Sequence, residues 1–527
     1  MRQGSWLNIF AMSKTVYSQW FRFSWHVVAL LIIFGLGLSH LYYPLGPDQA
    51  TILYGAKALD HGATLYIEYW DNKQPGLYYF YYFAGQLFGF NEFGIHLLEL
   101  IWLVFFATIL VITLRSYFQH KWLAPIVPVA TIAVYYAVVG VDELTQLEMI
   151  AGLPIYLSMW FALRAIRNPH KLMLPLVMSG VFAGIAVLFK LLLGAIVMLI
   201  WGIALVYLLK HKTNHALLLA TKAVLALLSG TAIPLVFTLG YFWSQEGLYP
   251  LLWTAFIYPG QALVQSPAAS LSRLITAAGF YLSYYGPWLI FVVIAVYKWG
   301  RNRFDVLTSM LIGWLCMALI LFIVQRFSWW HYHALLLFVP TGILAVLGIG
   351  HVINYLHSQL PESRVKMEIL AGLVILLPLL AALAPAFIYK SQQLLSYLWI
   401  RNGGIQQYQS KISPHYQALR QSAEFLRHKE AKSGPIYVFG NAMIYAFAER
   451  QCAYTMTGSA WEFYLPEQIG DILDNLAEKN VPYIFVGKND YKIYSMNIAV
   501  KIFLNSRYKV LKTDVGGTWY RLTDDID

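Results

Sequence analysis

Apolar residues occur in long runs, separated by short polar segments, up to about residue 390. A helix needs roughly 20 apolar residues to cross the hydrocarbon core of a bilayer. The runs that approach this length are 25–43, 95–114, 123–140, 147–163, 173–189, 191–209, 219–242, 275–297, 305–325, 334–354 and 369–389. The pattern predicts a polytopic α-helical membrane protein with about 11 transmembrane helices.

The pattern changes after residue 390 to that of ordinary soluble protein. Short strands are predicted at 435–439, 482–486, 508–511 and 518–522, with helices at 405–428 and 466–479. Alternation of strands and helices indicates a small α/β domain. We therefore expect an N-terminal tail (1–24), a transmembrane domain (25–390) whose first outer loop spans 44–94, and a C-terminal α/β domain (391–527).

Composition supports a membrane protein, because 59% of residues are hydrophobic and only 12% are charged, against about 25% charged in soluble domains. The net charge of +11 does not indicate a nucleic-acid partner, since Lys and Arg lie mostly in loops between apolar runs. They are most frequent on the side of the N-terminus, which predicts a cytoplasmic N-terminus. With eleven spans, the C-terminal domain is then extracytoplasmic. Cys316 and Cys452 form neither a disulfide framework nor a zinc-site spacing.

The first outer loop concentrates charged residues just outside the membrane. Asp48 follows the first span and can begin a short helix that ends near Leu59, while Asp71 and Lys73 precede a Pro-Gly turn. Long loops of membrane-bound scaffolds commonly carry function. The next segment, 77–88, is rich in tyrosine and suits the headgroup level of a membrane. It is either an aromatic belt or a lipid-contacting segment.

Other charged residues lie at or near membrane depth. Glu148 begins the fourth span, and Lys190 interrupts an apolar stretch. Charges at such depth are costly and need partners, so Lys190 either extends to the interface or holds a phosphate. Arg326 and His331 belong to QRFSWWHYH at the outer end of the ninth span, where they could bind a phosphate or a sugar. His331 and His333 have no third ligand nearby, so a metal site is not indicated.

One stretch, GPDQATILYGAKALDHGATLYIEYWDNKQPGLYYFY, is similar to the first outer loop of the C-type (GT-C) glycosyltransferases. The similarity is closest to the branch of the protein O-mannosyltransferases and lipid A aminoarabinose transferases. Weaker similarities are Leu147-Glu148 before a helix with a proline, Leu188-Phe189-Lys190, and Arg326 with His331-Tyr332. The resemblance covers most of 25–350 and the C-terminal domain in outline. Two departures are Asp48-Gln49, where the family usually has Asp-Glu, and Gln74-Pro75, where it has Pro-Pro.

The resemblance implies a GT-C-like fold and roles for individual residues. Asp48 corresponds to the catalytic acid, while the residues implied to bind substrate are Asp71, Lys73, Glu148, Lys190, Arg326 and His331. The implied reaction moves a sugar from a polyprenyl-phosphate donor to an extracytoplasmic glycan, glycolipid or protein acceptor, by single displacement with inversion. The donor is a monophosphate lipid, so no cofactor or divalent metal is expected. The implied location is the plasma membrane, in bacteria the inner membrane, in contact with membrane lipids.

Two other functions share some of these features. A transporter or lipid flippase also has many spans and intramembrane charges, but it commonly shows an inverted repeat with charges near the midplane. We see no repeat, and the predicted charges cluster on one face of the membrane. A non-catalytic assembly subunit could use the outer domain for docking. The clustered charges disfavour that function, because such clusters occur mostly at active sites.

Overall fold

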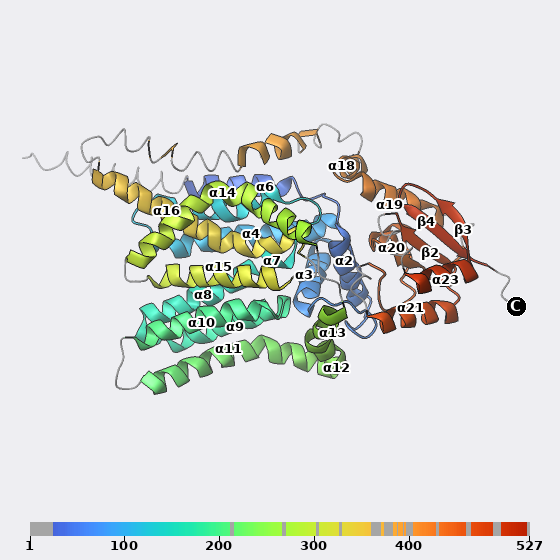
Figure 1. Cartoon of the computed structure of the whole chain (residues 1–527), viewed down its shortest axis with the longest axis horizontal. Coiled ribbons are helices and arrows are strands. Elements are labelled where there is room, and N and C mark those ends of the chain that lie inside the picture. The colour runs from blue at the N-terminus through green and yellow to red at the C-terminus, as the bar shows by residue number, and fades with distance from the viewer. Residues whose placement is uncertain are drawn as a thin grey trace, which may run out of the picture.

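The computed structural model describes residues 25–210, 216–265, 270–301, 305–325, 329–359, 404–427, 432–459, 465–488 and 497–523, with short pieces between 370 and 396. It has a bundle of long helices and, beyond one end of this bundle, a smaller domain with a sheet (Figure 1). The first outer loop contains α2 (Pro47–Asp60) and α3 (Pro75–Phe88), and it lies where the two parts meet.

In the described part of the chain, seven helical stretches are long and apolar enough to cross a membrane, and three apolar helices are shorter. The long ones are Glu92–Tyr117, Lys121–Val138, Leu147–Arg167, Ala216–Ser244, Leu271–Arg301, Val306–Val324 and His331–Gln359, and the shorter ones are Trp25–Leu38, Met173–Phe189 and Leu193–Leu209. Each coincides with a predicted run. The predicted run 369–389 lies largely outside the described residues, so the polytopic fold is confirmed while the count of about 11 helices stays a prediction.

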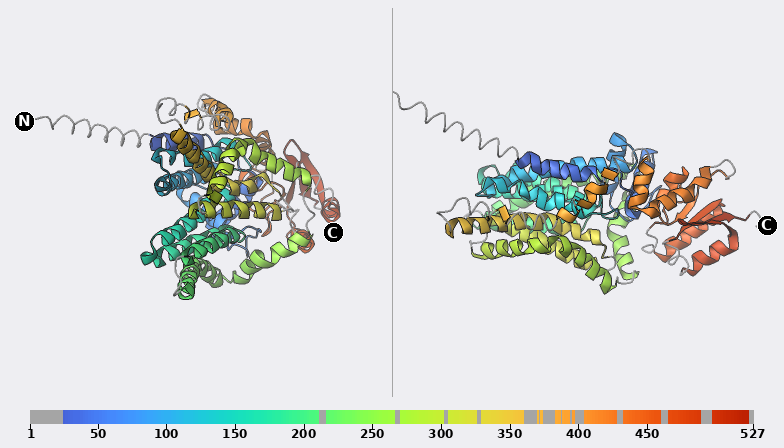
Figure 2. Two further views of the ribbon diagram at one scale, coloured as in Figure 1. Left: turned by 60° about the vertical axis from the view of Figure 1, so that its left-hand side comes forward. Right: turned by 90° about the horizontal axis from the view of Figure 1, so that it is seen from above.

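The helices of the bundle run side by side, as two further views show (Figure 2). Their bounds are α4 (Glu92–Leu114), α5 (Ile126–Pro128), α6 (Val134–Val138), α7 (Leu147–Ile150), α8 (Gly152–Arg167), α9 (Met173–Phe189), α10 (Leu193–Leu209), α11 (Ala216–Ser244), α14 (Leu271–Arg301), α15 (Val306–Val324) and α16 (Phe338–Gln359). A Cβ on Gly180 of α9 would collide with the backbone oxygen of Leu227 of α11. Small residues thus let these two helices approach to backbone contact, as is common in membranes.

The helices differ in how far their neighbours cover them. The apolar window of His331–Gln359 is 83% buried, whereas that of α11 is only 17% buried. Phe237 and Leu217 on α11 are among the many large apolar side chains that face outward. Such an extended apolar surface would be unstable in water. The exposed apolar face of α11 is therefore the expected lipid-facing side of the bundle.

The outer segments contain short helices. Helix α2 confirms the predicted helix from Asp48 to Leu59. Helix α3 buries Tyr78 and Tyr81 completely but exposes Phe83 and Leu87, so one of its faces belongs to the protein core and the other is available to lipid. The second long outer connection folds into α12 (Leu248–Leu252), a π-helical turn (Trp253–Ile257) and α13 (Tyr258–Gln265).

The C-terminal domain has a four-stranded sheet in the order β1-β2-β4-β3. Its elements are α18 (Gly404–Ile412), α19 (Pro414–Glu424), β1 (Tyr437–Phe439), α20 (Met443–Ala448), α21 (Pro466–Glu478), β2 (Tyr483–Gly487), α23 (Ile498–Arg507), β3 (Tyr508–Thr513) and β4 (Gly517–Leu522). Strand β1 pairs with β2 in parallel, and β4 pairs with both β2 and β3 antiparallel. The predicted strands are confirmed. The predicted helix 405–428 is wrong as a single element, because Ser413 caps α19 and Pro414 begins it.

Candidate active site

A lysine held between two carboxylates forms the centre of the first outer loop. Lys73 Nζ lies 3.1 Å from Asp48 Oδ1 and 3.2 Å from Asp71 Oδ2. Asp48 occupies the first turn of α2, behind Pro47, where a negative charge suits the helix dipole. Burial would lower the pKa of the Lys73 ammonium, but the charges of Asp48 and Asp71 outweigh it and raise this pKa. Lys73 is therefore charged at neutral pH.

The two carboxylates differ in their surroundings. Asp71 is buried and accepts hydrogen bonds from Tyr78 OH (2.5 Å) and from the Asn72 amide (2.8 Å). The Asp48 side chain is 27% exposed and accepts a hydrogen bond of 3.0 Å from Tyr332 OH, at the start of the 3₁₀ turn His331–Leu337. Asp71 is thus fixed as a structural partner of Lys73, whereas Asp48 keeps access to solvent.

A second ion pair joins Lys190, on the turn between α9 and α10, to Glu148 of α7. Lys190 Nζ lies 3.1 Å from Glu148 Oε1 and donates a hydrogen bond of 2.6 Å to Gln325 Oε1. The other Glu148 oxygen is buried and has no hydrogen-bond partner among the described residues. The Leu191 amide donates to Gln74 Oε1 (2.5 Å). This bond joins the Lys190 turn to the loop that carries Lys73.

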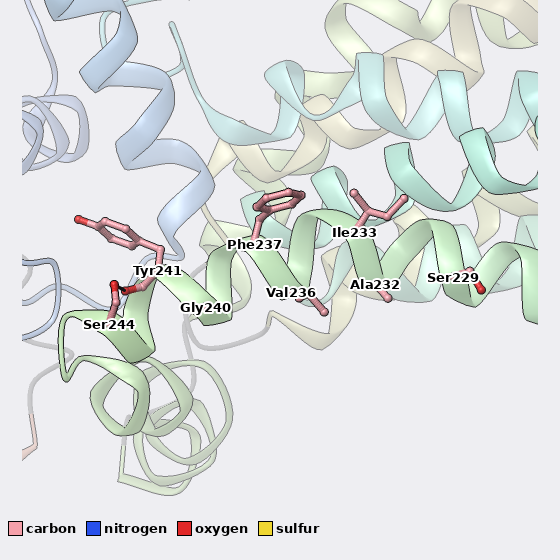
Figure 3. A pocket seen from close by; sticks show the side chains of 8 residues that line it. All are labelled: Ser229, Ala232, Ile233, Val236, Phe237, Gly240, Tyr241 and Ser244. Carbon is pink, nitrogen blue, oxygen red and sulfur yellow. Dashed lines mark hydrogen bonds between the residues drawn. The ribbon is translucent and has the colours of Figure 1, made fainter.

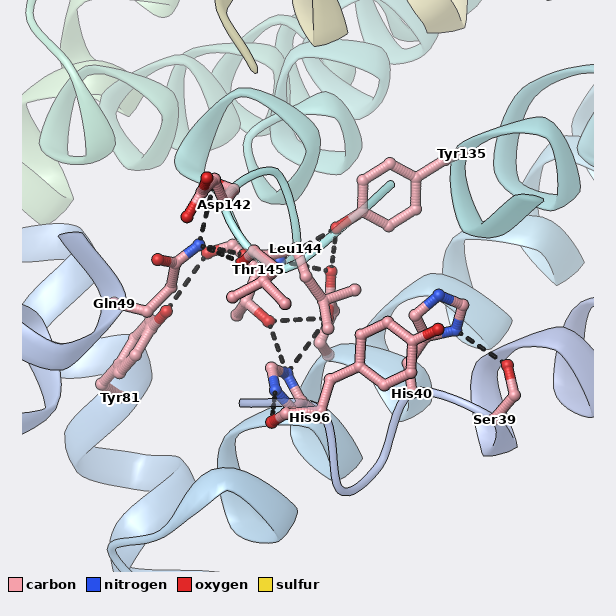
Figure 4. Close-up of polar contacts among 12 residues, drawn as sticks. Ser39, His40, Gln49, Tyr81, His96, Tyr135, Asp142, Leu144 and Thr145 are labelled. Atoms are coloured by element: carbon pink, nitrogen blue, oxygen red, sulfur yellow. Dashed lines mark hydrogen bonds and ion pairs between the residues drawn. The ribbon is translucent and has the colours of Figure 1, made fainter. Parts of the chain in front are cut away.

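The second outer turn, residues 141–146, lies beside Gln49, the residue after Asp48 (Figure 4). Gln49 Nε2 donates to the carbonyl oxygens of Val141 (3.3 Å), Asp142 (3.1 Å) and Leu144 (2.7 Å). The carboxylate of Glu143 on this turn lies 3.4 Å from Nδ1 of His331. Gln49 therefore fixes the acidic turn beside Asp48, which explains why an amide stands here in place of a second acid.

A buried polar network from α4 and α6 holds this turn in place. The sequence analysis missed this network. The Thr145 amide and hydroxyl donate to the two oxygens of Glu99 (3.1 and 2.7 Å), while Nδ1 of His96 lies 2.9 Å from the same hydroxyl. Tyr135 OH also donates to Glu99. Figure 4 shows His96 of α4 and Tyr135 of α6 directed towards the turn at Thr145. Glu99 could have been found from the sequence, because it is a carboxylate within the apolar run 95–114 and therefore needs a polar partner.

The structure brings most of the predicted residues to one end of the bundle. Asp48 and Asp71 share Lys73, Glu148 pairs with Lys190, and His331 pairs with Glu143. Arg326 lies outside the described residues. No group of three or more His, Cys, Asp or Glu side chains in the described ranges has the arrangement of a metal site.

Solved structures resemble this chain over nearly its whole length. No protein-family model and no curated protein sequence matches it. ArnT from Cupriavidus metallidurans with undecaprenyl phosphate bound aligns with a TM-score of 0.58 and 13% identity over 95% of this chain and 98% of ArnT. The apo state of that ArnT gives a TM-score of 0.59 and 13% identity, over 96% and 98% of the two chains.

A third match is the archaeal oligosaccharyltransferase AglB from Archaeoglobus fulgidus, in complex with an inhibitory peptide and a dolichol-phosphate. It covers 97% of this chain and 75% of AglB, with a TM-score of 0.52 and 15% identity. The chain has the GT-C fold. At this identity the match establishes the fold alone, so the roles of individual residues in this chain depend on the geometry described above.

Proposed function

We propose that this chain is a membrane glycosyltransferase that moves a sugar from a polyprenyl-phosphate donor to an extracytoplasmic acceptor. One observation carries the proposal: a partly exposed carboxylate, Asp48, directly contacts the charged Lys73 in the first outer loop of a GT-C fold. The GT-C neighbours ArnT and AglB were solved with undecaprenyl phosphate and dolichol-phosphate bound. A lipid phosphate is the anion that suits an ammonium group at the surface of a membrane.

The proposed reaction is a single displacement with inversion. The acceptor hydroxyl oxygen forms a bond to the anomeric carbon, the bond from that carbon to the phosphate oxygen breaks, and the phosphate leaves with the electron pair. Asp48 takes the hydroxyl proton, which contributes on the order of 10²–10⁴-fold to the rate. Lys73 and Lys190, with Arg326 as a further candidate, stabilise the charge on the leaving phosphate.

Two neighbouring hollows beside α3 and α11 suit the isoprenoid tail of the donor. One has a volume of about 590 Å³, is lined by eight residues between Ser229 and Ser244 of α11 (Figure 3), and is mostly apolar. The other, of about 400 Å³, is lined by Leu59, Tyr79 and Tyr82 together with Phe237 and Tyr241 of α11. Phe237 and Tyr241 line both hollows, so the two adjoin, and together they are called the groove below. We propose that a lipid tail lies there while its phosphate reaches Lys73.

The proposal also places the chain in the membrane. The candidate site and the C-terminal domain lie at the same end of the bundle (Figure 1). The positive-inside rule predicts that this end is extracytoplasmic and the N-terminus cytoplasmic. We propose the plasma membrane, in bacteria the inner membrane, as its location.

Asp48→Asn tests the proposed function. We compare cell-envelope glycans and glycoproteins by mass spectrometry in cells that lack the chain and in cells with the wild-type chain, Asp48→Asn or Asp60→Asn. Asp60 is a matched control, because it is an exposed acid at the other end of α2. A sugar that depends on the wild-type chain should remain with Asp60→Asn and disappear with Asp48→Asn, since only the latter removes the base. A sugar that persists with correctly inserted Asp48→Asn contradicts the base role.

An envelope that is identical with and without the chain contradicts glycosyl transfer as a whole. In that case, movement of a lipid across proteoliposomes that contain the purified chain, with no sugar transferred, would identify the chain as a transporter or flippase.

A further inference from the structure

A short segment of the C-terminal domain, residues 451–459, joins the sheet to the first outer loop. On its sheet side, the Ile436 amide donates to the Gln451 carbonyl (3.0 Å), and the Ala453 amide donates back to the Ile436 carbonyl (2.9 Å). Further along, the Gly440 amide donates to the Gly458 carbonyl (3.1 Å). The segment therefore lies along β1 and is hydrogen-bonded to the residues at both ends of this strand.

The other side of the segment is bonded to the first outer loop at three points. The Trp70 amide donates to the Thr455 carbonyl (2.9 Å). The Cys452 amide donates to the hydroxyl of Tyr54 on α2 (2.8 Å). The hydroxyl groups of Ser459 and Thr51 are also hydrogen-bonded. The Tyr54 ring packs on Tyr445 of α20, with centroids 4.9 Å apart, so these bonds lie in a packed interface between the domains.

These three points lie close in sequence to the carboxylates that hold Lys73. Thr51 lies on α2 nearly one turn after Asp48, and Trp70 directly precedes Asp71. A further hydrogen bond, from Tyr69 OH to the Thr51 carbonyl (2.8 Å), links the two parts of the loop to each other. The segment thus contacts both pieces of backbone whose separation determines the distance between Asp48 and Asp71.

We infer that the 451–459 segment is a positioning element of the reaction centre, so that the C-terminal domain is required for chemistry as well as for any contact with the acceptor. The inference rests on the proposed function. Its physical basis is that catalysis needs groups placed to within a fraction of an ångström, and a displacement of about 1 Å can cost on the order of 10²-fold in rate. The first outer loop has only short helices of its own, so it depends on neighbouring structure for a fixed geometry.

The test uses the full-length chain with the double variant Tyr54→Phe and Ser459→Ala. This variant removes the acceptor of the Cys452 amide and the hydroxyl partner of Thr51, and it leaves Asp48, Asp71 and Lys73 intact. The matched control is Tyr249→Phe with Ser506→Ala, two exposed positions. We measure amide hydrogen exchange, binding of undecaprenyl phosphate, and the rate of sugar transfer.

The inference predicts faster exchange at residues 48–54 and 69–73 in the double variant, with no change in the control. It also predicts that kcat falls at least about tenfold, because the carboxylates are displaced, while undecaprenyl phosphate still binds, because Lys190 keeps its own contacts with Glu148 and Gln325. Unchanged exchange at 48–54 and 69–73 overturns the inference. A wild-type chain that transfers no sugar overturns the proposed function, yet the exchange result still decides whether the segment holds the loop.

A disulfide variant shows whether the lower rate of the Tyr54→Phe and Ser459→Ala variant comes from lost positioning or from misfolding. In Thr51→Cys with Ser459→Cys, made in a Cys316→Ala and Cys452→Ser background, a disulfide replaces the bond between the two hydroxyl groups. The oxidised protein should keep wild-type exchange at 48–54 and at least about half of the wild-type rate, whereas reduction should lower the rate. An oxidised protein that is inactive but folded overturns the inference, because the domain would then have to move away from the loop during turnover.

Discussion

Gln49 shows how one residue can fix the presentation of a neighbouring catalytic group. It follows Asp48 in α2, and its side-chain amide donates to three carbonyl oxygens of the second outer turn. A carboxylate at this position would offer those carbonyl oxygens no donor and would add a negative charge to an acidic site. The Asp-Gln pair is therefore a structural feature of this chain.

Gln49→Glu should destabilise the fold although it restores the pair that the GT-C family usually has. Unsatisfied buried acceptors cost about 1–3 kcal/mol, so we expect the melting temperature of the detergent-solubilised protein to fall by several degrees. The exposed Gln406→Glu serves as the control, since it adds the same charge without burying it. Equal melting temperatures for Gln49→Glu and the wild type would show that the amide does not hold the turn.

The candidate residues of the first outer loop were predicted from the sequence because the features that mark them lie within one short stretch of the chain. Asp48 behind Pro47, and Lys73 before a Pro-Gly turn, can be recognised within one short stretch. Tyr332 was not assigned to Asp48, because their contact joins positions 284 residues apart. The packing of the 3₁₀ turn His331–Leu337 against α7 brings Tyr332 to Asp48.

At the scale of elements, the second outer turn is held in place by polar side chains that lie within predicted apolar helices, such as Glu99 of α4. Runs of apolar residues predicted α4 well, but they gave no partner for its Glu99. The structure supplies that partner in Thr145, whose φ of 56° places it in the left-handed region. The geometry of this turn depends on tertiary hydrogen bonds, which is why sequence patterns alone did not predict it.

The same turn predicts a pH dependence. Burial, followed by the negative charges of Glu143 and Asp48, raises the pKa of the Asp142 carboxyl above its ordinary value of 3.8. The folded state then binds this proton more tightly than the unfolded state, so the free energy of unfolding falls as the pH rises through that raised pKa. At neutral pH the ionised Asp142 therefore costs stability.

Asp142→Asn should remove this cost. We expect its melting temperature to exceed that of the wild type at about pH 7, with a difference that shrinks towards pH 4, where Asp142 is increasingly protonated in both states. Melting curves across this range check the prediction, with Asp60→Asn as the control for loss of an exposed acid. A difference that is constant with pH, or a less stable Asp142→Asn at pH 7, would contradict it.

At the scale of the whole molecule, the chain combines a lipid-facing bundle with an outer α/β domain, and the candidate site lies where they meet (Figures 1 and 2). Apolar runs and strand–helix alternation predicted both parts. They could not predict that segment 451–459 touches the first outer loop, because that contact joins residues about 400 positions apart. The domain boundaries near residues 24 and 390 stay predictions, since much of the chain around them lies outside the described ranges.

The proposed phosphate site is best tested by a structure of the full-length chain in a lipid nanodisc with undecaprenyl phosphate. We expect the phosphate within hydrogen-bond distance of Lys73 Nζ and Lys190 Nζ, with its tail along the groove between α3 and α11. Asp48 should then lie on the side of the phosphate where a sugar would be attached. A phosphate bound at the opposite end of the bundle, with Lys73 still held between Asp48 and Asp71, would show that this loop is not the donor site.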